Sequence, residues 1–402
     1  MNTEKLRSET PGCAHVTHFN NAGSALMPQP VIDAQQNYLN YEINQGGYEA
    51  VDHFREQLNE TYQRVAQLIN ADATEIALLE SATTAWVKAF FSLTLKAGDR
   101  IVTAKAEYAT NYINYLHLEK SQQVSIEVVP NDESGQISVA ALEKLLEADQ
   151  DKTIKLISIT HIPTNGGLVN PAEEVGKLAK KYGVLFLLDA CQSVGQMPID
   201  VQKIGCDMLS ATGRKYLRAP RGTGFLYIRK SLLETIEPRE IDMFAAEWTS
   251  TDTYKLRDDA RKFEYYEYNP ANRMGLSAAV QYALDLGLDN IWSRIQHLGE
   301  ILRTRLAEIP NVTVHDLGQV KGGIVSFGVQ GIKTEFIKQK LREEGINVSL
   351  IIASGTLLDM QDRSLDHLVR ASVHYYNTEA EIDQLCGVIK KIILVHTRIE
   401  HS

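Results

Sequence analysis

The sequence predicts an α/β protein in which a large α/β/α domain, built on a mostly parallel sheet, is followed by a smaller α+β domain. Between about residues 75 and 230, short apolar runs alternate with stretches of helical period, as they do in βαβ units. Beyond about residue 270 this alternation gives way to long stretches of helical period with fewer apolar strands. The 402 residues, 44% of them hydrophobic, are enough to bury a sizeable core in more than one domain.

In the alternating region we expect six strands and two well-marked helices. One helix covers residues 139–148 after an N-cap serine, and the other covers residues 171–182, with a proline in its first turn and Gly183 just past its end. Before this region, apolar side chains recur at spacings of four and three from Phe54 to Ile69, which predicts an amphipathic helix. The predicted strands are Arg100–Ala104, Val124–Val129, Lys155–Thr160, Val184–Leu188, Met208–Ala211 and Gly224–Ile228.

The C-terminal part is predicted to form the smaller α+β unit. The predicted helices there cover residues 277–287, 291–309, 333–344 and 379–395, and the predicted strands cover residues 312–314, 323–329 and 368–375. Residues from about 230 to 270 follow neither period well, so we interpret them as a connector.

Charge and composition exclude several classes of protein. The formal net charge of −10 argues against a general nucleic-acid binder, because that affinity comes largely from clustered Lys and Arg. No apolar run approaches the ~18 residues that span a bilayer, and Met1–Gly12 is polar, without the apolar segment of a signal peptide. We therefore predict a cytoplasmic protein with no membrane and no nucleic-acid partner.

The four cysteines, Cys13, Cys191, Cys206 and Cys386, lie far apart and form no CxxC pair. This spacing predicts reduced thiols, with neither a zinc ribbon nor a disulfide framework, and no metal site. Cys386 lies on the apolar face of the last predicted helix, and Cys191 follows an apolar strand, so we interpret both as buried thiols. The alternative for Cys191 is that it approaches a ligand bound beside Asp189.

A cluster of cations stands out in this acidic chain. Arg214, Lys215, Arg218 and Arg221 fall within the segment Ser210–Gly224, whose glycines permit tight turns. We interpret the cluster as a local anion site, and the alternative is a solvated basic loop.

A carboxylate lies one βα unit earlier. The apolar run 184–188 ends in Asp189, and the carboxyl end of a parallel strand is where open α/β sheets place their ligands. A buried Asp needs a cationic partner, unless it is only the N-cap of the next helix.

One ligand satisfies these features together. Pyridoxal 5′-phosphate (PLP) requires an amine, a carboxylate beside its ring nitrogen and donors around its phosphate. Lys215, Asp189 and the region of Arg214 supply the three. Ser81–Thr84 precedes a largely apolar helical stretch, and a helix N-terminus favours phosphate, although Ser and Thr there can also be simple caps.

Five segments, in order, resemble blocks of the class V aminotransferases, the cysteine-desulfurase-like branch of the fold type I PLP enzymes. The resemblance spans nearly the whole chain. It implies a large PLP-binding domain over residues 18–265, a small C-terminal domain over residues 266–402 with residues 1–17, and a homodimer. The segments are Asn21–Ala25, Ala82–Thr84, Asp189–Gln192, Thr212–Lys215 and Arg370–Thr378.

The resemblance also implies roles for individual residues. Lys215 is the Schiff-base lysine, Asp189 the partner of the ring nitrogen, and Gln192 a donor to the ring hydroxyl. Tyr108 stacks on the ring, where relatives often have histidine, and Thr164 contacts the ring. The residues implied at the phosphate are Ala82, Thr83, Thr84, Thr212 and Arg214, and those implied at an amino-acid substrate are Arg370, for its carboxylate, and Asn21.

The choice of reaction depends on a missing residue. Desulfurases need a cysteine on a loop before the carboxylate-binding arginine, because a thiolate takes up the sulfur. The corresponding stretch, Asn347–Thr356, has none. We therefore favour β-elimination from a cysteine S-conjugate or its sulfoxide, with Lys215 removing the α-proton.

The residues of several motifs resemble those of the ergothioneine-pathway C–S lyases, which cleave a cysteine-conjugate sulfoxide, and this resemblance implies that Tyr108 could protonate the leaving sulfur. The motifs are Gly213–Lys215, Arg218–Gly224, Tyr108 and Ala371–Thr378. The product would be pyruvate, ammonia and a sulfur compound. The alternatives are a class V aminotransferase or an amino-acid epimerase that uses the same residues on a small amino acid, and a protein of this fold kept as a binding or regulatory module.

Overall fold

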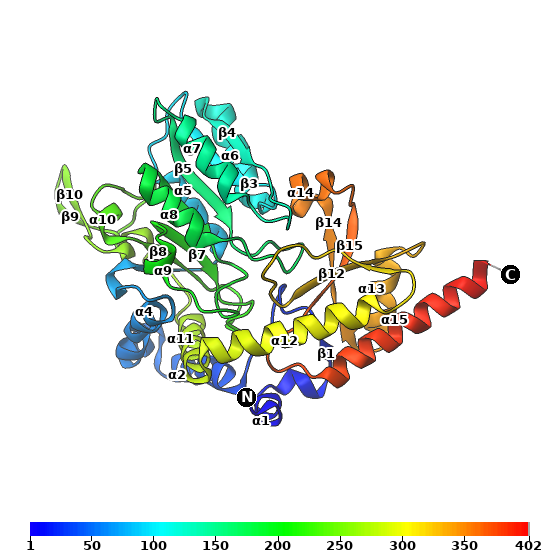
Figure 1. Cartoon of the computed structure of the whole chain (residues 1–402). Coiled ribbons are helices and arrows are strands. Elements are labelled where there is room, and N and C mark those ends of the chain that lie inside the picture. Colours follow the sequence, from blue (N-terminus) through cyan, green and yellow to red (C-terminus); the bar gives the residue numbers. More distant parts are fainter. Residues whose placement is uncertain (401–402) are drawn as a thin grey trace.

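The computed structural model describes residues 1–400, and its larger sheet has seven strands (Figure 1). The strand order is β2–β8–β7–β6–β5–β3–β4, and of these strands only β8 runs antiparallel to its neighbours. The predicted mostly parallel sheet is therefore confirmed. The strands are β2 (Ile76–Leu79), β3 (Arg100–Ala104), β4 (Ser125–Val129), β5 (Ile154–Thr160), β6 (Leu185–Asp189), β7 (Met208–Thr212) and β8 (Gly224–Ile228).

Helices cover both faces of this sheet, because each central strand is apolar on both sides. On one face, Leu187 of β6 shares a core with Trp86 of α5. On the other face, Phe186 and Leu188 share a core with Leu178 of α8. The helices of this layered unit are α5 (Ala82–Phe91), α6 (Ala109–Gln122), α7 (Val139–Ala148), α8 (Ala172–Tyr182), α9 (Val201–Ile204) and α10 (Lys230–Leu233).

The smaller unit has an antiparallel sheet in the order β11–β12–β15–β14, packed against helices α12 and α13, and the long helix α15 packs on these two helices (Figure 1). The predicted α+β character is confirmed. Its elements are β11 (Val312–Val314), β12 (Ile324–Val329), β14 (Ser349–Ile352), β15 (His367–Ser372), α12 (Leu288–Ala307), α13 (Thr334–Glu343), α14 (Leu357–Asp362) and α15 (Glu379–Glu400).

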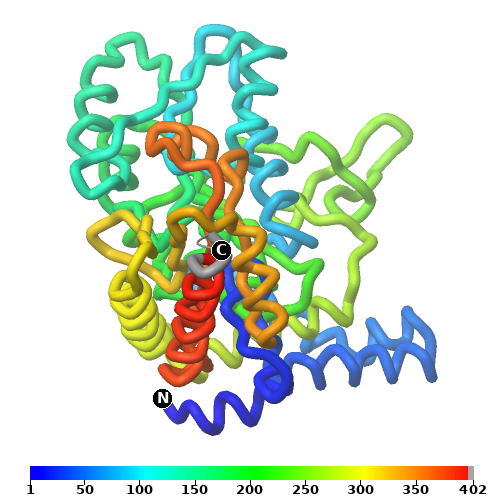
Figure 2. The backbone as a smooth tube through the Cα atoms, turned by 90° about the vertical axis from the view of Figure 1, so that its right-hand side faces the viewer, coloured from blue at the N-terminus to red at the C-terminus, as the bar shows by residue number. Residues whose placement is uncertain are grey.

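The N-terminal residues lie against the smaller unit. After α1 (Thr3–Ser8), strand β1 (Thr17–His18) pairs in parallel with β13 (Ile346–Asn347). Figure 2 shows the N-terminal segment running beside this unit. Short 3₁₀ turns lie at Pro11–Ala14, Ala73–Glu75, Ala260–Phe263 and Ala353–Gly355.

The connector predicted between about residues 230 and 270 is wrong in part. It contains a hairpin of β9 (Ala246–Ser250) and β10 (Thr253–Leu256), which projects from the body (Figures 1 and 2). Most of the hairpin side chains are exposed, so they carry no buried face for a pattern to record. The next helix, α11 (Pro270–Leu286), also begins earlier than predicted.

Helix α11 packs against two N-terminal helices, α2 (Gln29–Gln45) and α4 (Arg55–Ile69), with α3 (Gly47–His53) between them in sequence. Among the described residues, no helix is both long enough and apolar enough to cross a membrane.

The chain order places a crevice at one edge of the large sheet. From β3 the chain goes outward to β4, and then returns to β5 on the other side of β3. At such a reversal the crossover segments leave a hollow at the carboxyl ends of the strands.

Candidate active site

A cavity lies at the carboxyl ends of β3, β5, β6 and β7, the edge at which open α/β sheets bind their ligands. Most of the predicted cofactor-binding residues line it. The exceptions among the predicted site residues are Thr84, Asn21 and Arg370. The lining residues are Ser81, Ala82, Thr83, Tyr108, Asn111, Thr160, Ile162, Thr164, Asp189, Cys191, Gln192, Thr212, Arg214 and Lys215.

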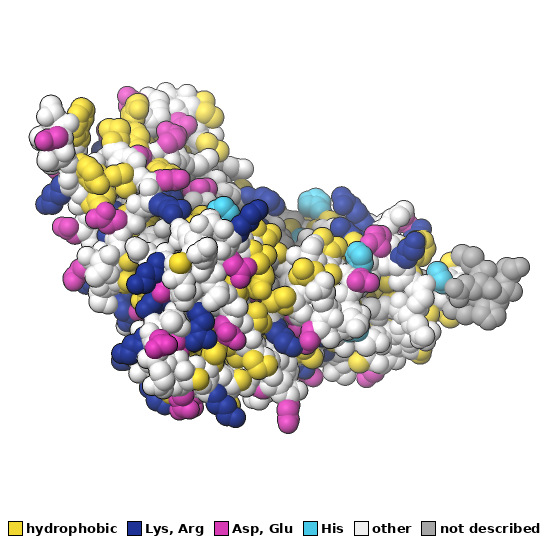
Figure 3. Space-filling view, turned by 90° about the horizontal axis from the view of Figure 1, so that it is seen from above, with side chains coloured by type: hydrophobic (Ala, Val, Ile, Leu, Met, Phe, Trp, Pro, Cys, Tyr) yellow, Lys and Arg dark blue, Asp and Glu magenta, His cyan; other side chains and the backbone are white. Residues whose placement is uncertain are grey.

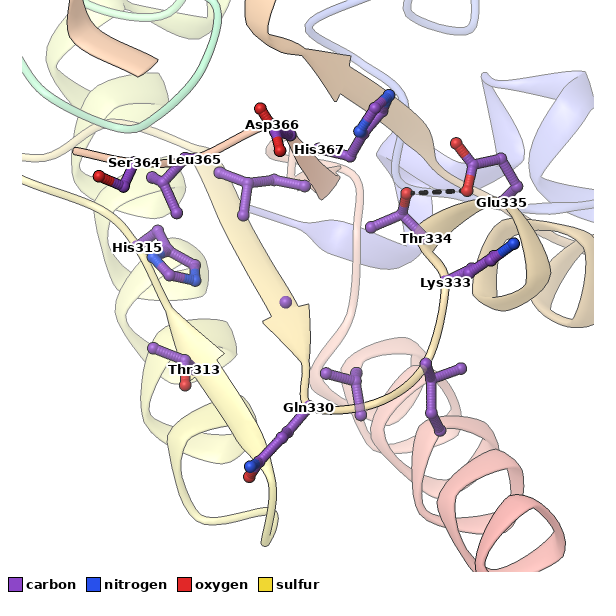
Figure 4. Close-up of a pocket in the computed structure, with 14 residues that line it drawn as sticks. Thr313, His315, Gln330, Lys333, Thr334, Glu335, Ser364, Leu365, Asp366 and His367 are labelled. Atoms are coloured by element: carbon purple, nitrogen blue, oxygen red, sulfur yellow. Dashed lines mark hydrogen bonds between the residues drawn. The ribbon is translucent and has the colours of Figure 1, made fainter. Parts of the chain in front are cut away.

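A second and larger hollow, of about 1550 Å³, lies in the smaller unit between β11, β12 and the start of α13 (Figure 4). Its polar side chains do not converge: His315 and His367 lie on opposite sides of it, and Thr334 is hydrogen-bonded to the neighbouring Glu335. None of the predicted site residues lines it. We therefore take the cavity at the large sheet as the candidate active site.

Asp189 ends β6 and is only 5% exposed. Its Oδ1 accepts a hydrogen bond from the Cys191 amide at 2.9 Å, and its Oδ2 accepts one from Asn111 Nδ2 at 2.9 Å. Burial raises the pKa of Asp189, and these hydrogen bonds and Lys215 only partly oppose the rise. A cationic N–H group beside this carboxylate would offset its desolvation, as a protonated pyridine nitrogen would.

Lys215 lies on the loop between β7 and β8 and is 9% exposed. Burial lowers the pKa of its amine, although Cys191 and Asp189 partly oppose this. A lowered pKa favours the neutral amine, which is the form that attacks a carbonyl carbon. A Cβ on Gly195 would lie 2.6 Å from the amide nitrogen of Leu217, so this glycine lets the turn after Asp189 approach the lysine loop.

One end of the cavity is formed by the N-terminus of α5. Ser81 is its N-cap and accepts a hydrogen bond from the Thr84 amide at 3.0 Å, which leaves the amides of Ala82 and Thr83 at the free first turn. A Cβ on Gly224 would lie 2.9 Å from the nitrogen of Ala82, so the glycine lets β8 approach this turn. An oxyanion such as a phosphate fits here.

The threonines predicted at the phosphate are placed differently from one another. Thr83 and Thr212 line the cavity, and the Thr212 hydroxyl donates to the Thr223 carbonyl at 3.3 Å. The Thr84 hydroxyl instead donates to Glu80 Oε1 at 2.8 Å. Thr84 is therefore directed away from the cavity in this structure.

The prediction that four neighbouring cations form one anion site is wrong for two of them. Arg214 and Lys215 line the cavity, and Arg214 donates to the Gly23 carbonyl. Arg218 is instead buried, where it donates to the Tyr375 hydroxyl at 2.8 Å. Arg221 is exposed. The spacing of the cations could not reveal that the chain reverses at Arg218, whose φ is 60°.

Gln192 and Thr164 reach the cavity with polar groups. Gln192 Nε2 donates to the Ala22 carbonyl at 3.1 Å, and its buried Oε1 has no hydrogen-bond partner within the described chain. Thr164 accepts from Arg370 Nη1 through both its hydroxyl, at 2.6 Å, and its carbonyl, at 3.1 Å. Tyr108 precedes α6 and is 38% exposed.

The two residues predicted at the substrate differ in their freedom to bind. Arg370 is buried behind Thr164, and its Nε has no hydrogen-bond partner within the described chain. Asn21 is fully buried, and its amide is already used by the carbonyls of His18 and Ser372 and by the Tyr376 hydroxyl. The prediction that Asn21 contacts the substrate therefore lacks a free polar atom.

The cysteine predictions have different outcomes. Cys386 is buried among the apolar side chains of α15, as predicted. Cys191 is only partly buried and lines the cavity, so the prediction of a simple core thiol is wrong. Burial nevertheless raises the pKa of its thiol, with Lys215 opposing the rise.

The prediction missed Asn111, Thr160 and Glu107. Asn111 and Thr160 line the cavity, and Glu107 is buried just behind it. Burial raises the pKa of Glu107 to about 7, against the hydrogen bond from Thr160. The signal was present, because Glu107 follows a predicted strand at its carboxyl end, as Asp189 does.

These observations fit a bound PLP. The buried carboxylate of Asp189 lacks an ion-pair partner within the described chain, Gln192 offers a free polar atom, and the N-terminus of α5 offers free amides. The amine of Lys215 lies in the same cavity.

Comparisons with known proteins agree with this geometry. The family model described as aminotransferase class-V matches residues 17–385. A probable cysteine desulfurase of Pyrococcus abyssi is 30% identical over 400 residues, covering 97% of each chain.

Solved structures have the same fold. The apo structure of a cysteine desulfurase from Thermococcus onnurineus NA1 has a TM-score of 0.89 and 28% identity, covering 97% of each chain. A cystine C–S lyase in complex with its product, cysteine persulfide, has a TM-score of 0.84 and 24% identity, covering 94% of this chain and 98% of its own.

Proposed function

Because the chain belongs to the class V aminotransferase family, whose enzymes use PLP, we propose that it is a C–S β-lyase that acts on a small amino acid. The proposed substrate is a cysteine S-conjugate or its sulfoxide. The proposed products are pyruvate, ammonia and a sulfur compound.

The observation that carries this proposal is the distribution of thiols. A desulfurase needs a reactive thiolate beside the substrate. The stretch 347–356 has no cysteine, and the thiol that lines the cavity, Cys191, has a raised pKa that favours its inert protonated form. Without an acceptor thiolate, elimination is the simpler outcome for sulfur on a substrate's β-carbon.

PLP, when bound, supplies an electron-accepting ring that stabilises the substrate carbanion. We propose that Asp189 would accept a hydrogen bond from the protonated ring nitrogen, that Gln192 would bind the ring hydroxyl, and that Tyr108 and Thr164 would contact the ring. For the phosphate we propose Ala82, Thr83, Thr212 and Arg214. Thr84 could join them only if its side chain turned away from Glu80.

Lys215 is the proposed site of covalent attachment and the proposed base. Its lowered pKa suits an amine that takes the α-proton once the substrate has displaced it. Arg370 is the proposed partner of the substrate carboxylate, since its guanidinium can bind a carboxylate with two hydrogen bonds. Tyr108 lines the same cavity as Thr164, the residue to which Arg370 is hydrogen-bonded. We propose that this phenol protonates the departing sulfur.

The deciding experiment measures products from the purified enzyme with PLP. S-substituted cysteines and their sulfoxides should each give pyruvate, ammonium and the sulfur compound in equal amounts, with one water consumed. A keto acid that forms only when an amino acceptor is added would overturn the proposal in favour of an aminotransferase. Alanine and sulfane sulfur from free cysteine would overturn it in favour of a desulfurase, the activity named for the Pyrococcus relative.

An aminotransferase or epimerase is the second candidate, because it would use the same lysine, aspartate and arginine. Spectra separate the aminotransferase from the lyase, because a transaminase converts the cofactor to its amine form when the amino donor is supplied alone. A lyase leaves the cofactor in its aldehyde oxidation state. An epimerase is separated by its product, the substrate with its α-carbon inverted and no pyruvate.

We also propose that the enzyme is a homodimer. Large apolar side chains are exposed on the β9–β10 hairpin and just before it, with Trp248 79% and Met243 77% exposed. Ile43 and Tyr48, on α2 and α3, are also exposed. Figure 2 shows both regions projecting from the same side, and Figure 3 shows hydrophobic side chains gathered at the hairpin end. Light scattering should report twice the 44.9 kDa mass of the chain. The cytoplasmic location stays a prediction.

A further inference from the structure

Glu107 is a buried carboxylic acid that none of the proposed roles uses. It lies three residues beyond the end of β3, is 3% exposed, and is separated from the cavity by residues that line it. Burying a carboxylic acid costs free energy unless its oxygens are well hydrogen-bonded. Its contacts therefore decide what it does.

Every hydrogen bond to Glu107 comes from a donor on the cavity side or the strand beneath. Its Oε1 accepts from the Tyr108 amide at 2.8 Å, from Asn111 Nδ2 at 2.9 Å and from the Thr160 hydroxyl. Its Oε2 accepts from the Thr103 hydroxyl at 3.0 Å. Three of these four donors, those of Tyr108, Asn111 and Thr160, belong to residues that line the cavity.

Asn111 connects Glu107 to the Asp189 carboxylate. The same atom, Asn111 Nδ2, donates to Glu107 Oε1 and to Asp189 Oδ2, each at 2.9 Å. An amide nitrogen has two hydrogens, so this arrangement uses both. It also fixes which way the amide faces, because the amide oxygen would repel either carboxylate.

We propose that Glu107 is a positioning residue for the cofactor site. Through Asn111 it fixes the Asp189 carboxylate, and through the Tyr108 amide it fixes the point at which the Tyr108 side chain enters the cavity. The inference rests on the proposed placement of PLP in this cavity, and it holds whichever bond of the substrate is broken.

The test measures PLP binding to the apoprotein, with the visible circular dichroism of the bound cofactor as a second readout. E107A removes every acceptor and should weaken PLP binding about tenfold, with a smaller dichroism signal. E107Q keeps an acceptor oxygen for Tyr108 and Asn111 and should bind PLP within about twofold of wild type. E107M fills much the same space without an acceptor and should bind PLP as weakly as E107A, whereas wild-type affinity in E107M would mean that Glu107 only fills space.

The link through Asn111 is tested by a double-mutant cycle. If Glu107 acts through Asn111, the fold-loss of PLP affinity in E107A/N111A should be at least threefold smaller than the product of the fold-losses in the two single variants. Multiplicative losses would overturn the link. E107D, which keeps the charge and draws the carboxylate back by one methylene, replaces E107A if that variant does not fold, and should weaken binding several-fold.

A matched control is Glu75, which is also buried and accepts from the amides of Asp72, at 3.0 Å, and Lys230, at 2.7 Å, away from the cavity. E75A should lower thermal stability and leave PLP affinity unchanged. Wild-type PLP affinity in both E107A and E107D would overturn the role of Glu107 and leave the proposed cofactor site unaffected. Failure of the wild-type protein to bind PLP would instead overturn the proposed cofactor site.

Discussion

Arg370 donates two hydrogen bonds from a single nitrogen, Nη1, to Thr164: one to the hydroxyl at 2.6 Å and one to the backbone carbonyl at 3.1 Å. Its Nε has no hydrogen-bond partner within the described chain. Burial lowers the pKa of Arg370 to about 10, and Tyr216 only partly opposes this, so a carboxylate bound beside the guanidinium would stabilise its charged form. Thr164 thus fixes one edge of the guanidinium and leaves another donor for an incoming carboxylate.

Thr164→Val should therefore raise KM for the amino-acid substrate about tenfold and change kcat little. The valine keeps the backbone carbonyl and loses the hydroxyl, and a hydrogen bond to a charged group is worth about 1.5–3 kcal/mol. Steady-state kinetics measure the effect. Thr313→Val, at an exposed threonine in the smaller unit, is the matched control and should match wild type. An unchanged KM in Thr164→Val would refute this role.

Borohydride reduction should trap the cofactor on Lys215. The lowered pKa of this amine suits covalent bonding to the PLP aldehyde, whereas Lys262, also buried, already donates to the carbonyls of Leu233 and Ile236 at 2.7 Å each. Peptide mapping should place the reduced adduct at residue 215 and none at residue 262. Lys215→Ala should lose the adduct and the activity together. An adduct on any other lysine contradicts the proposed site.

Asp189→Asn should reduce the stabilisation that PLP gives to the fold. An uncharged amide cannot offset the charge of a protonated ring nitrogen, so PLP binds more weakly, and each tenfold loss removes about 1.4 kcal/mol of ligand-induced stability. Calorimetry with and without PLP measures the difference. Asp207→Asn is the control, because Asp207 accepts from the Phe186 amide at the opposite ends of the strands. Equal PLP-induced shifts in both variants would count against the role of Asp189.

The sequence predicted the large sheet well because its strands are short, apolar and separated by helices with clear end signals. Gly183 is one such signal, since it ends α8 with a φ of 69°. Asn269 and Pro270 formed another that was overlooked: the Asn269 side chain caps α11 by accepting from the Asn272 amide at 2.9 Å. The exposed hairpin offered no such pattern.

Site residues were predictable from the sequence where the chemistry requires one residue type. They were not predictable where the fold decides which way a side chain points. An amine and a carboxylate after strands indicated Lys215 and Asp189. The outward turn of Thr84 toward Glu80 and the burial of Arg218 depend on backbone conformation and distant partners. Asn111 was missed because it becomes important only once Glu107 and Asp189 are close in space.

Cys191→Ala should retain most of the activity, within about threefold of wild type. The raised pKa keeps this thiol protonated near neutral pH, and a protonated thiol is a poor nucleophile. Thiol-reactive labelling after turnover should find no persulfide on Cys191. Complete loss of activity, together with a persulfide on the wild-type residue, would show that Cys191 accepts sulfur and that the enzyme is a desulfurase.

Glu107→Gln should change how the stability of the apoprotein depends on pH. The pKa of Glu107 rises from its ordinary 4.5 to about 7 in the folded state, chiefly through burial. Its contribution to stability is therefore fully present below pH 4.5 and is lost as the pH rises through 7. At 1.36 kcal/mol per pKa unit, the loss is about 3 kcal/mol.

The glutamine variant has no charge to bury, so wild type should lose stability relative to Glu107→Gln between these pH values. Asp189, whose pKa is raised in the same direction, is present in both proteins, and its negative charge is one of the causes that raise the pKa of Glu107, so the difference reports Glu107 together with this coupling. Urea unfolding at pH 5, 6, 7 and 8 measures that difference. Parallel stability curves would mean that Glu107 keeps an ordinary pKa, and that its four hydrogen bonds compensate fully for its burial.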